Sequence, residues 1–154
     1  MTSNPEQTVL WDAYRRTTYV AHTGHGEIRI NPGRRSAALD RLLIEHRSRE
    51  WAYLTAYNPA SCRLPEEENA RRQRELVDAV RDRGLAFLDG EGTGEDTGWP
   101  PEPSVLILGI GLEDARALGR QFGQLAIVAG RIGERARLVA CDRQKGFLSR
   151  PPQP

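Results

Sequence analysis

The chain has 154 residues, a length that suits one domain with a sizeable hydrophobic core. Apolar residues make up 38% of the sequence, which is too many for a disordered protein. The 22 basic and 21 acidic residues leave a net charge of +1, which argues against a general polyanion-binding protein. Because no apolar run approaches about 18 residues, we expect no membrane-spanning helix.

The first residues and the cysteines indicate a compartment. Residues 1–7 contain neither the basic region nor the apolar region of a secretory signal. Cys62 and Cys141 lie far apart in the sequence and form no Cys-x-x-Cys pair, which is typical of reduced thiols. We therefore expect a cytoplasmic protein. A nucleophilic role for Cys62 is a weaker alternative, since no base stands near it in the sequence.

The first third of the chain predicts a helix, a β-hairpin and a second helix. In residues 6–16 the apolar side chains recur at helical spacing. Two β-prone stretches, 17–22 and 27–30, flank a glycine-rich turn that favours a hairpin. Ser36 can then cap a helix whose apolar residues again recur at helical spacing.

The rest of the chain predicts alternating strands and helices. Pro65, which three glutamates follow, is typical of a helix start, because acidic residues favour the positive end of the helix dipole. The run at 105–110 is apolar on both faces, which indicates a central strand that is covered on both sides. The expected order is a strand at 51–57, a helix from 65 to 84, a strand at 85–88, a loop at 89–103, a strand at 105–110, a helix at 112–122, and strands at 125–128 and 136–141.

From residue 51 to residue 128 this order is β-α-β-β-α-β, which predicts an α+β protein with a ferredoxin-like, split β-α-β core. The helix, hairpin and helix before it form an N-terminal extension, and the strand at 136–141 is one extra C-terminal strand. We expect a single domain over residues 1–148 and a flexible tail at 149–154.

Right-handed crossovers in this topology bring several polar segments to one end of the sheet. That end receives the loop after the first core strand, the long loop before the central strand and the turn after the second core helix. A loop as long as 89–103 is often functional. The side chains that we expect at this polar end, as candidate ligand-binding residues, are Asn58, Ser61, Asn69, Trp99, Glu102, Ser104, Gln121 and Gln124.

Each of these residues also has a structural alternative. Glu102 can act as a general base or a metal ligand, or it can cap backbone N–H groups or pair with an arginine. Asn58 and Asn69 can bind the polar edge of a ligand or satisfy backbone groups of a turn. The two glutamines can contact a ligand or fasten the end of their helix. Trp99 can stack on a planar ligand or cover the core.

The remaining motifs are weak. His22 and His25 form a His-x-x-His pair whose nearest acidic neighbour is Glu27, which is too few ligands for a metal site. Gly109 and Gly111 resemble part of a dinucleotide-binding motif, but an aspartate takes the place of its third glycine. The sequence therefore assigns no metal site, and it names no cofactor.

Four runs of the sequence, at 51–61, 67–69, 99–104 and 117–128, resemble a bacterial family catalogued as domain of unknown function 3293. The resemblance extends over most of the chain and includes the residues of the polar end. It implies a bacterial, cytoplasmic protein, and it brings no known reaction.

Three functions remain as alternatives. The first is binding of a polar small molecule at the polar end, with Glu102 as the candidate catalytic residue if the ligand is turned over. The second is a regulatory or homodimerising interaction module. The third, RNA binding, is disfavoured: Trp51, Tyr53 and Tyr57 supply aromatic residues on the first core strand, but the central strand supplies none.

Overall fold

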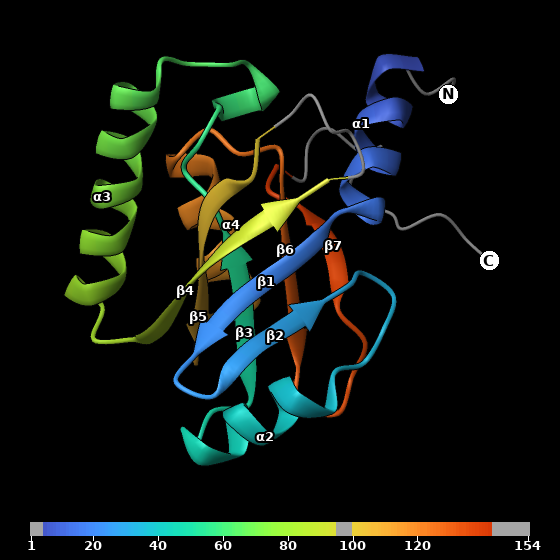
Figure 1. Ribbon diagram of the computed structural model, residues 1–154, viewed down its shortest axis with the longest axis vertical. Helices are drawn as coiled ribbons and strands as arrows, with labels where there is room; N and C mark the ends of the chain where they lie inside the picture. Colours follow the sequence, from blue (N-terminus) through green and yellow to red (C-terminus); the bar gives the residue numbers. More distant parts are fainter. Residues whose placement is uncertain (1–4, 95–99, 143–154) are drawn as a thin grey trace.

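The computed structural model describes residues 5–94 and 100–142, which form four α-helices around one curled seven-stranded sheet (Figure 1). The α+β class predicted from the sequence is confirmed. The helices are α1 (Pro5–Arg16), α2 (Ala37–Glu45), α3 (Glu66–Asp82) and α4 (Leu112–Gln121), with a short 3-10 turn, η1, at Pro59–Ser61. The strands are β1 (Thr18–Thr23), β2 (Gly26–Ile30), β3 (Glu50–Leu54), β4 (Ala86–Thr93), β5 (Glu102–Leu108), β6 (Ala126–Arg131) and β7 (Arg137–Ala140).

Local sequence explains where the helices begin and end. The side chain of Ser36 accepts a hydrogen bond from Leu39 N at 3.1 Å and so caps α2, as predicted. The helix α3 begins directly after Pro65, with three glutamates in its first turn, and Gly84 follows it with a φ of +70° that suits a helix end. No helix in the described ranges combines the length and the apolar composition needed to cross a membrane.

Neighbouring strands of the sheet all pair antiparallel, in the order β2-β1-β4-β5-β3-β6-β7. The strand β3 lies between β5 and β6, and its Tyr53 is opposite Leu106 on one side and Val128 on the other. The N-terminal hairpin extends the sheet beyond β4, so β2 forms one edge and β7 forms the other.

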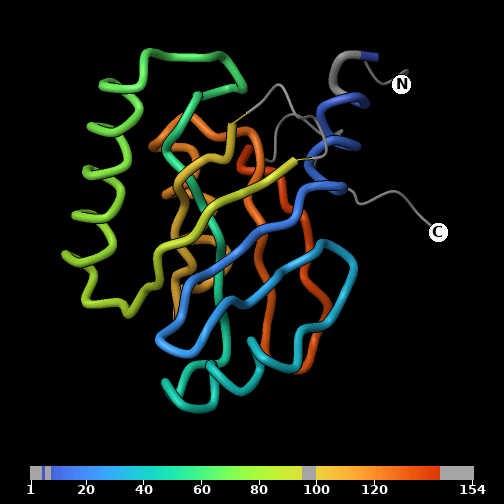
Figure 2. Tube along the Cα trace, viewed as in Figure 1, coloured from blue at the N-terminus to red at the C-terminus, as the bar shows by residue number. Residues whose placement is uncertain are grey.

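The sheet curls until its two edges approach each other. The Tyr53 hydroxyl of β3 donates a hydrogen bond to the Val20 carbonyl of β1 at 2.8 Å, although β4 and β5 separate these strands in the sheet. In a flat sheet, with about 4.8 Å between strands, β1 would be out of reach. At the edges, Gly33 N donates to Ala136 O at 2.7 Å, and Ala136 N donates to Arg34 O at 2.9 Å. Figure 2 shows the segment after β2 (cyan) beside the start of β7 (red).

The curl gives the sheet an inner and an outer face, each with its own hydrophobic core. On the inner face the strand side chains pack with Trp11 of α1 and Leu43 of α2. On the outer face they pack with Leu76 of α3 and Leu118 of α4. Residues 105–108 alternate between the two cores, which confirms the prediction of a central strand covered on both sides.

Within the predicted loop at 89–103, residues 89–93 and 102–103 belong to strands. The strand β4 continues to Thr93, β5 begins at Glu102, and Gly92 pairs with Glu102. Glycines and acidic residues predicted a loop here because both are depleted in strands. Ladder pairing of β4 with β1 on one side and β5 on the other outweighs that low propensity.

The first core strand, predicted over 51–57, ends at Leu54. The backbone of the following residues bonds to side chains instead of a strand, since Ala56 N donates to Gln73 Oε1 at 2.9 Å. The tail predicted at 149–154 lies outside the described residues.

Candidate functional site

A pocket of about 630 Å³ opens between α1 and the inner face of the sheet. Its surface is mainly apolar, with contributions from α1, β3, β6 and β7. Its polar lining includes Tyr14, Ser61, Glu102, Ser104 and Gln124. Its lining includes Ser61 of η1 and Tyr14 of α1, and α1 lies at the upper end of the molecule in Figure 1. Pockets of this size hold small organic molecules.

Small residues on the inner face leave room for the pocket. Large side chains such as Trp51 fill other parts of the inner face, whereas the pocket is lined by Gly92 of β4 and Ser104 of β5. A Cβ on Gly90 would lie 2.9 Å from the Tyr53 hydroxyl, so glycine at this position admits the tyrosine. The Tyr53 ring meets that of Tyr19 edge to face, with 5.3 Å between the ring centres, and the two rings form an aromatic wall.

Glu102 stands in the polar part of the pocket, and a buried pair of asparagines holds it. Its Oε1 accepts a hydrogen bond from Asn58 Nδ2 at 3.0 Å. Asn58 Oδ1 accepts from Asn69 Nδ2 at 2.8 Å and from Leu64 N at 3.0 Å. Asn58 N in turn donates to Asn69 Oδ1 at 2.9 Å. Neither asparagine lines the pocket, so the pair orients Glu102 from behind.

The segment that carries Ser61 has an uncommon backbone conformation. Asn58, Ala60 and Ser61 have φ values of 46°, 54° and 59°, in the left-handed region. That region costs residues such as alanine and serine roughly 1–2 kcal/mol each. Ala60 N donates to Gly123 O at 2.8 Å, and Ser61 Oγ lies 2.6 Å from the Tyr14 hydroxyl. Backbone strain of this kind concentrates at functional sites. Here the strained segment η1 is joined to α1 across the pocket by the hydrogen bond between Ser61 and Tyr14.

Gln124 and Ser104 line the pocket, and the hydrogen-bond donors of both side chains are bonded to backbone carbonyl groups. Gln124 Nε2 donates to the Tyr57 carbonyl at 3.1 Å and to the Phe122 carbonyl at 3.3 Å. Ser104 Oγ donates to the Glu102 carbonyl at 2.9 Å. Gln124 therefore fastens the end of α4 and also presents its amide oxygen as an acceptor.

The structure places four of the eight residues expected at the polar end on the pocket surface, namely Ser61, Glu102, Ser104 and Gln124. Asn58 and Asn69 stand behind Glu102 and are buried. Gln121 is exposed and does not line the pocket. Trp99 lies outside the described residues.

Sequence reasoning missed the part of the site that α1 and β1 supply. Tyr14 and Tyr19 line the pocket, as do Leu10 and Ala13. Leu10 and Tyr14 share a helical face in the sequence, and that periodic signal predicts a helix without indicating what the face covers. Periodicity cannot tell a face that covers a core from one that covers a pocket, because both are apolar.

The tyrosine hydroxyls around the pocket are neutral groups at neutral pH. Burial raises the pKa of Tyr14, the hydrogen bond with Ser61 lowers it, and the charge of Glu102 raises it again. Burial is also the main cause of the raised pKa of Tyr19 and of Tyr53. These phenols therefore act as neutral hydrogen-bonding groups beside a carboxylate.

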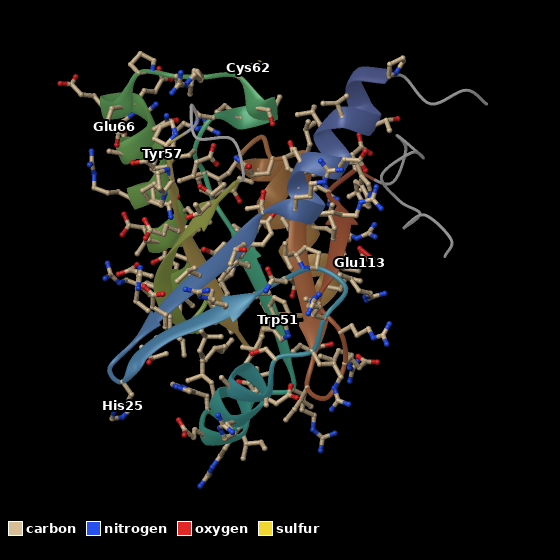
Figure 3. The ribbon with its side chains drawn as sticks, turned by 45° about the vertical axis from the view of Figure 1, so that its right-hand side comes forward. His25, Trp51, Tyr57, Cys62, Glu66 and Glu113 are labelled. Carbon is tan, nitrogen blue, oxygen red and sulfur yellow. The ribbon has the colours of Figure 1, made fainter. Side chains whose placement is uncertain are left out.

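The other reactive residues lie away from the pocket lining. Figure 3 shows His25 at the opposite end of the molecule from Cys62, and Tyr57 beside Glu66, to which it donates a hydrogen bond of 2.7 Å. His22 Nδ1 is 3.9 Å from Glu27, a contact between two exposed side chains. Across residues 5–94 and 100–142, no three His, Cys, Asp or Glu side chains are grouped to hold a metal ion.

Comparison with known families confirms the resemblance seen in the sequence. Residues 54–127 match the model of a family described as protein of unknown function (DUF3293). The matched segment includes the four predicted residues that line the pocket, whereas α1, β1 and β7 lie outside it. No curated protein and no solved structure matches the chain.

Proposed function

We propose that this protein, which resembles a family of unknown function over residues 54–127, binds a small molecule in the pocket under α1. The observation that carries the proposal is the pocket itself: about 630 Å³ of mainly apolar surface with a few polar groups near Glu102. Ligand sites combine these features, because apolar walls supply affinity and a few polar groups fix the orientation of the ligand. The ligand is therefore an amphipathic molecule rather than a fully polar one.

Binding can be tested with N-phenylnaphthylamine, a neutral apolar dye that fluoresces strongly outside water. Ala13 lines the pocket from the exposed surface of α1, so Ala13→Phe fills space without disturbing the core. Val9 is 68% exposed on the same helix and does not line the pocket, so Val9→Phe is the matched control. We expect the dye to bind the wild-type protein and the control alike, and the Ala13→Phe variant roughly tenfold more weakly.

Two outcomes would contradict the proposal. Either the wild-type protein leaves the fluorescence of the dye unchanged, or Ala13→Phe and Val9→Phe bind it equally well. Thermal unfolding of each variant, measured in parallel, separates a filled pocket from a protein that has lost its fold.

For the finer fold assignment, we propose that β3, α3, β4, β5, α4 and β6 form a ferredoxin-like unit. The strand order β4-β5-β3-β6, with antiparallel pairing throughout, supports this assignment. The packing of α3 and α4 on the same, outer face of these strands supports it as well.

A cytoplasmic location is also a proposal. Cys62 and Cys141 are both free thiols, and Cys62 is exposed. Exposed thiols persist in reducing compartments, which supports this location.

A further inference from the structure

We infer that a surface around α2 binds the phosphate backbone of duplex DNA without regard to base sequence. The surface belongs to residues 34–50 and 131–137, which contain α2 and the turn between β6 and β7. Figure 1 shows α2 at the opposite end of the molecule from α1. The inference therefore concerns a different part of the molecule from the pocket and does not depend on the proposed function.

Arginines gather in these two segments. Together the segments contain eight arginines and four acidic residues, a net charge of +4, whereas the whole chain has a net charge of +1. The near-neutral charge of the chain is therefore an average over an uneven distribution. All eight arginines are exposed, and they are called the arginine surface below: Arg34, Arg35, Arg41, Arg47, Arg49, Arg131, Arg135 and Arg137.

Hydrogen bonds hold the two segments side by side. Ile132 N donates to Arg49 O at 2.8 Å, and Gly133 N donates to Asp40 Oδ1 of α2 at 2.9 Å. The bonds between the two edges of the sheet, described above, place the loop after β2 there as well. The arginines thus come from several elements and form one surface. Charges that are spread in this way suit a ligand with many separated negative charges better than a single small anion.

Most members of the arginine surface have no acidic partner. Arg35 is 4.0 Å from Asp40, and Arg131 is 3.3 Å from Glu50. Among the residues that the structure describes, the other six arginine side chains form no ion pair. Their guanidinium groups are therefore exposed and open to an external anion.

The exposed arginines of α3 are arranged differently. Arg71 is 2.8 Å from Glu75 and 3.9 Å from Glu68, and Arg81 is 3.9 Å from Asp78. Such pairs, one helical turn apart, are typical of a solvated helix face. Arginine content alone therefore does not create a basic surface in this protein. The arginine surface is distinguished by its small number of acidic neighbours.

The backbone of DNA complements these features. A guanidinium group can bind two phosphate oxygens at once, which gives stronger and more directional contacts than an ammonium group does. Solvent weakens each exposed contact taken alone. On DNA, however, every neutralised phosphate also releases condensed counterions, so several such contacts together produce binding.

Other polyanions fit the arginine surface less well. Residues 34–50 and 131–137 contain no Phe, Trp or Tyr, on which the bases of a single strand would stack. Arginine has no acceptor for the 2′-hydroxyl groups through which proteins recognise duplex RNA. Insertion into a lipid membrane requires a free apolar helix face, but Leu39 and Leu43 of α2 are buried in the inner core.

Fluorescence anisotropy of a short fluorescein-labelled DNA duplex, titrated with the chain, tests the inference. We expect a Kd of about 1–10 μM at about 50 mM NaCl. At about 200 mM NaCl the affinity should be roughly a hundredfold lower, as for about four phosphate contacts. A labelled single strand of the same sequence should bind more weakly than the duplex.

A triple variant tests the location of the contacts. It replaces one arginine in each of three segments: Arg41→Gln, Arg49→Gln and Arg135→Gln. Within the described ranges these side chains make no hydrogen bond or ion pair, so the fold should persist. We expect this variant to bind the duplex at least about tenfold more weakly at about 50 mM NaCl, and to lose most of the salt dependence.

The matched control replaces three exposed arginines of α3: Arg71→Gln, Arg74→Gln and Arg81→Gln. It lowers the net charge of the chain by the same amount, so it separates the position of the charges from their sum. We expect it to bind the duplex as the wild-type protein does. Thermal unfolding of both triple variants, measured in parallel, verifies that they are folded.

The inference is overturned if the duplex does not bind at about 50 mM NaCl, or if its affinity does not fall with salt. It is also overturned if the folded α3 variant loses as much affinity as the folded variant of the arginine surface. Tighter binding of the single strand than of the duplex would contradict it as well. So would binding to vesicles of phosphatidylserine and phosphatidylcholine in equal parts without binding to the duplex.

Discussion

Asn58 occupies a position where a backbone requirement and a side-chain requirement coincide. Its φ of 46° lies in the left-handed region, which asparagine tolerates better than most residues. Its amide donates to Glu102 and accepts from both Asn69 and Leu64 N. Aspartate could accept but not donate, and glycine could supply only the backbone conformation. Asn58 therefore shapes the site by holding Glu102 in place.

We expect Asn58→Ala to lower the free energy of unfolding by about 2–4 kcal/mol. Alanine is strained at this φ, and the buried amide of Asn69 loses a hydrogen-bond partner. Urea unfolding measures the change, and Gln121→Ala, at an exposed position, should alter stability by less than about 0.5 kcal/mol. If Asn58→Ala is as stable as that control, the asparagine pair does not stabilise the fold.

At the scale of elements, β4 is where the sheet curls. A Cβ on Gly90 would lie 2.0 Å from the Val20 carbonyl of β1 and 2.9 Å from the Tyr53 hydroxyl. The strand β1 therefore approaches β4 more closely than any side chain at this position allows. The same approach brings the Val20 carbonyl within reach of Tyr53, whose hydrogen bond ties β1 to β3 across the inner face.

We expect Gly90→Ala to destabilise the protein by about 3 kcal/mol, because the added methyl group overlaps backbone that cannot move without breaking the β1–β4 pairing. Gly24→Ala in the β1–β2 turn is the control, since a Cβ there meets nothing within 4 Å and its change should stay under about 0.5 kcal/mol. Urea midpoints of the two variants measure the difference. Equal midpoints would mean that β1 can shift at no cost and that Gly90 does not fix the curl.

The helices could be predicted from the sequence because their signals are local. The cap at Ser36 and the start at Pro65 mark α2 and α3 within a few residues. The extent of β4 could not be predicted, since it depends on pairing with β1, a strand more than sixty residues earlier in the chain. The site divides in the same way. The predicted topology was enough to place Glu102 and its neighbours at one end of the sheet. The position of the α1 and β1 tyrosines in the pocket depends on the curl of the whole sheet, which the sequence does not reveal.

At the scale of the whole molecule, the three aromatic residues in and just after β3 are buried. Trp51 is 2% exposed, Tyr53 is 3% exposed and Tyr57 is 7% exposed. RNA binding by a sheet of this kind requires exposed rings on which bases stack. These three rings, which motivated the RNA-binding alternative, are not available for stacking. The walls of the pocket also lie on the inner face of the sheet, where they are shielded from solvent, and this supports the proposal of a small-molecule ligand.

Burial on this scale also makes stability depend on alkaline pH. Burial raises the pKa of the Cys141 thiol from 9.0 to about 12, although Arg120 and Arg116 lower it. Burial, with the hydrogen bond to Glu66, raises the pKa of Tyr57 from 10.0 to about 12. The unfolded chain loses these protons at lower pH than the folded chain does. The stabilisation is therefore complete below about pH 9 and is lost as the pH rises toward about 12.

We expect the free energy of unfolding to fall by about 1.4 kcal/mol between about pH 8 and about pH 10 through the Cys141 thiol alone, since one proton is released on unfolding over one unit of pH above its unfolded pKa. In Cys141→Ala this part of the decline disappears and the contribution of the buried tyrosines remains. Urea unfolding under reducing conditions, repeated across this pH range, measures both slopes. Cys62→Ala removes an exposed thiol instead and should keep the wild-type slope. If Cys141→Ala declines as steeply as wild type, the buried thiol is not the group that titrates.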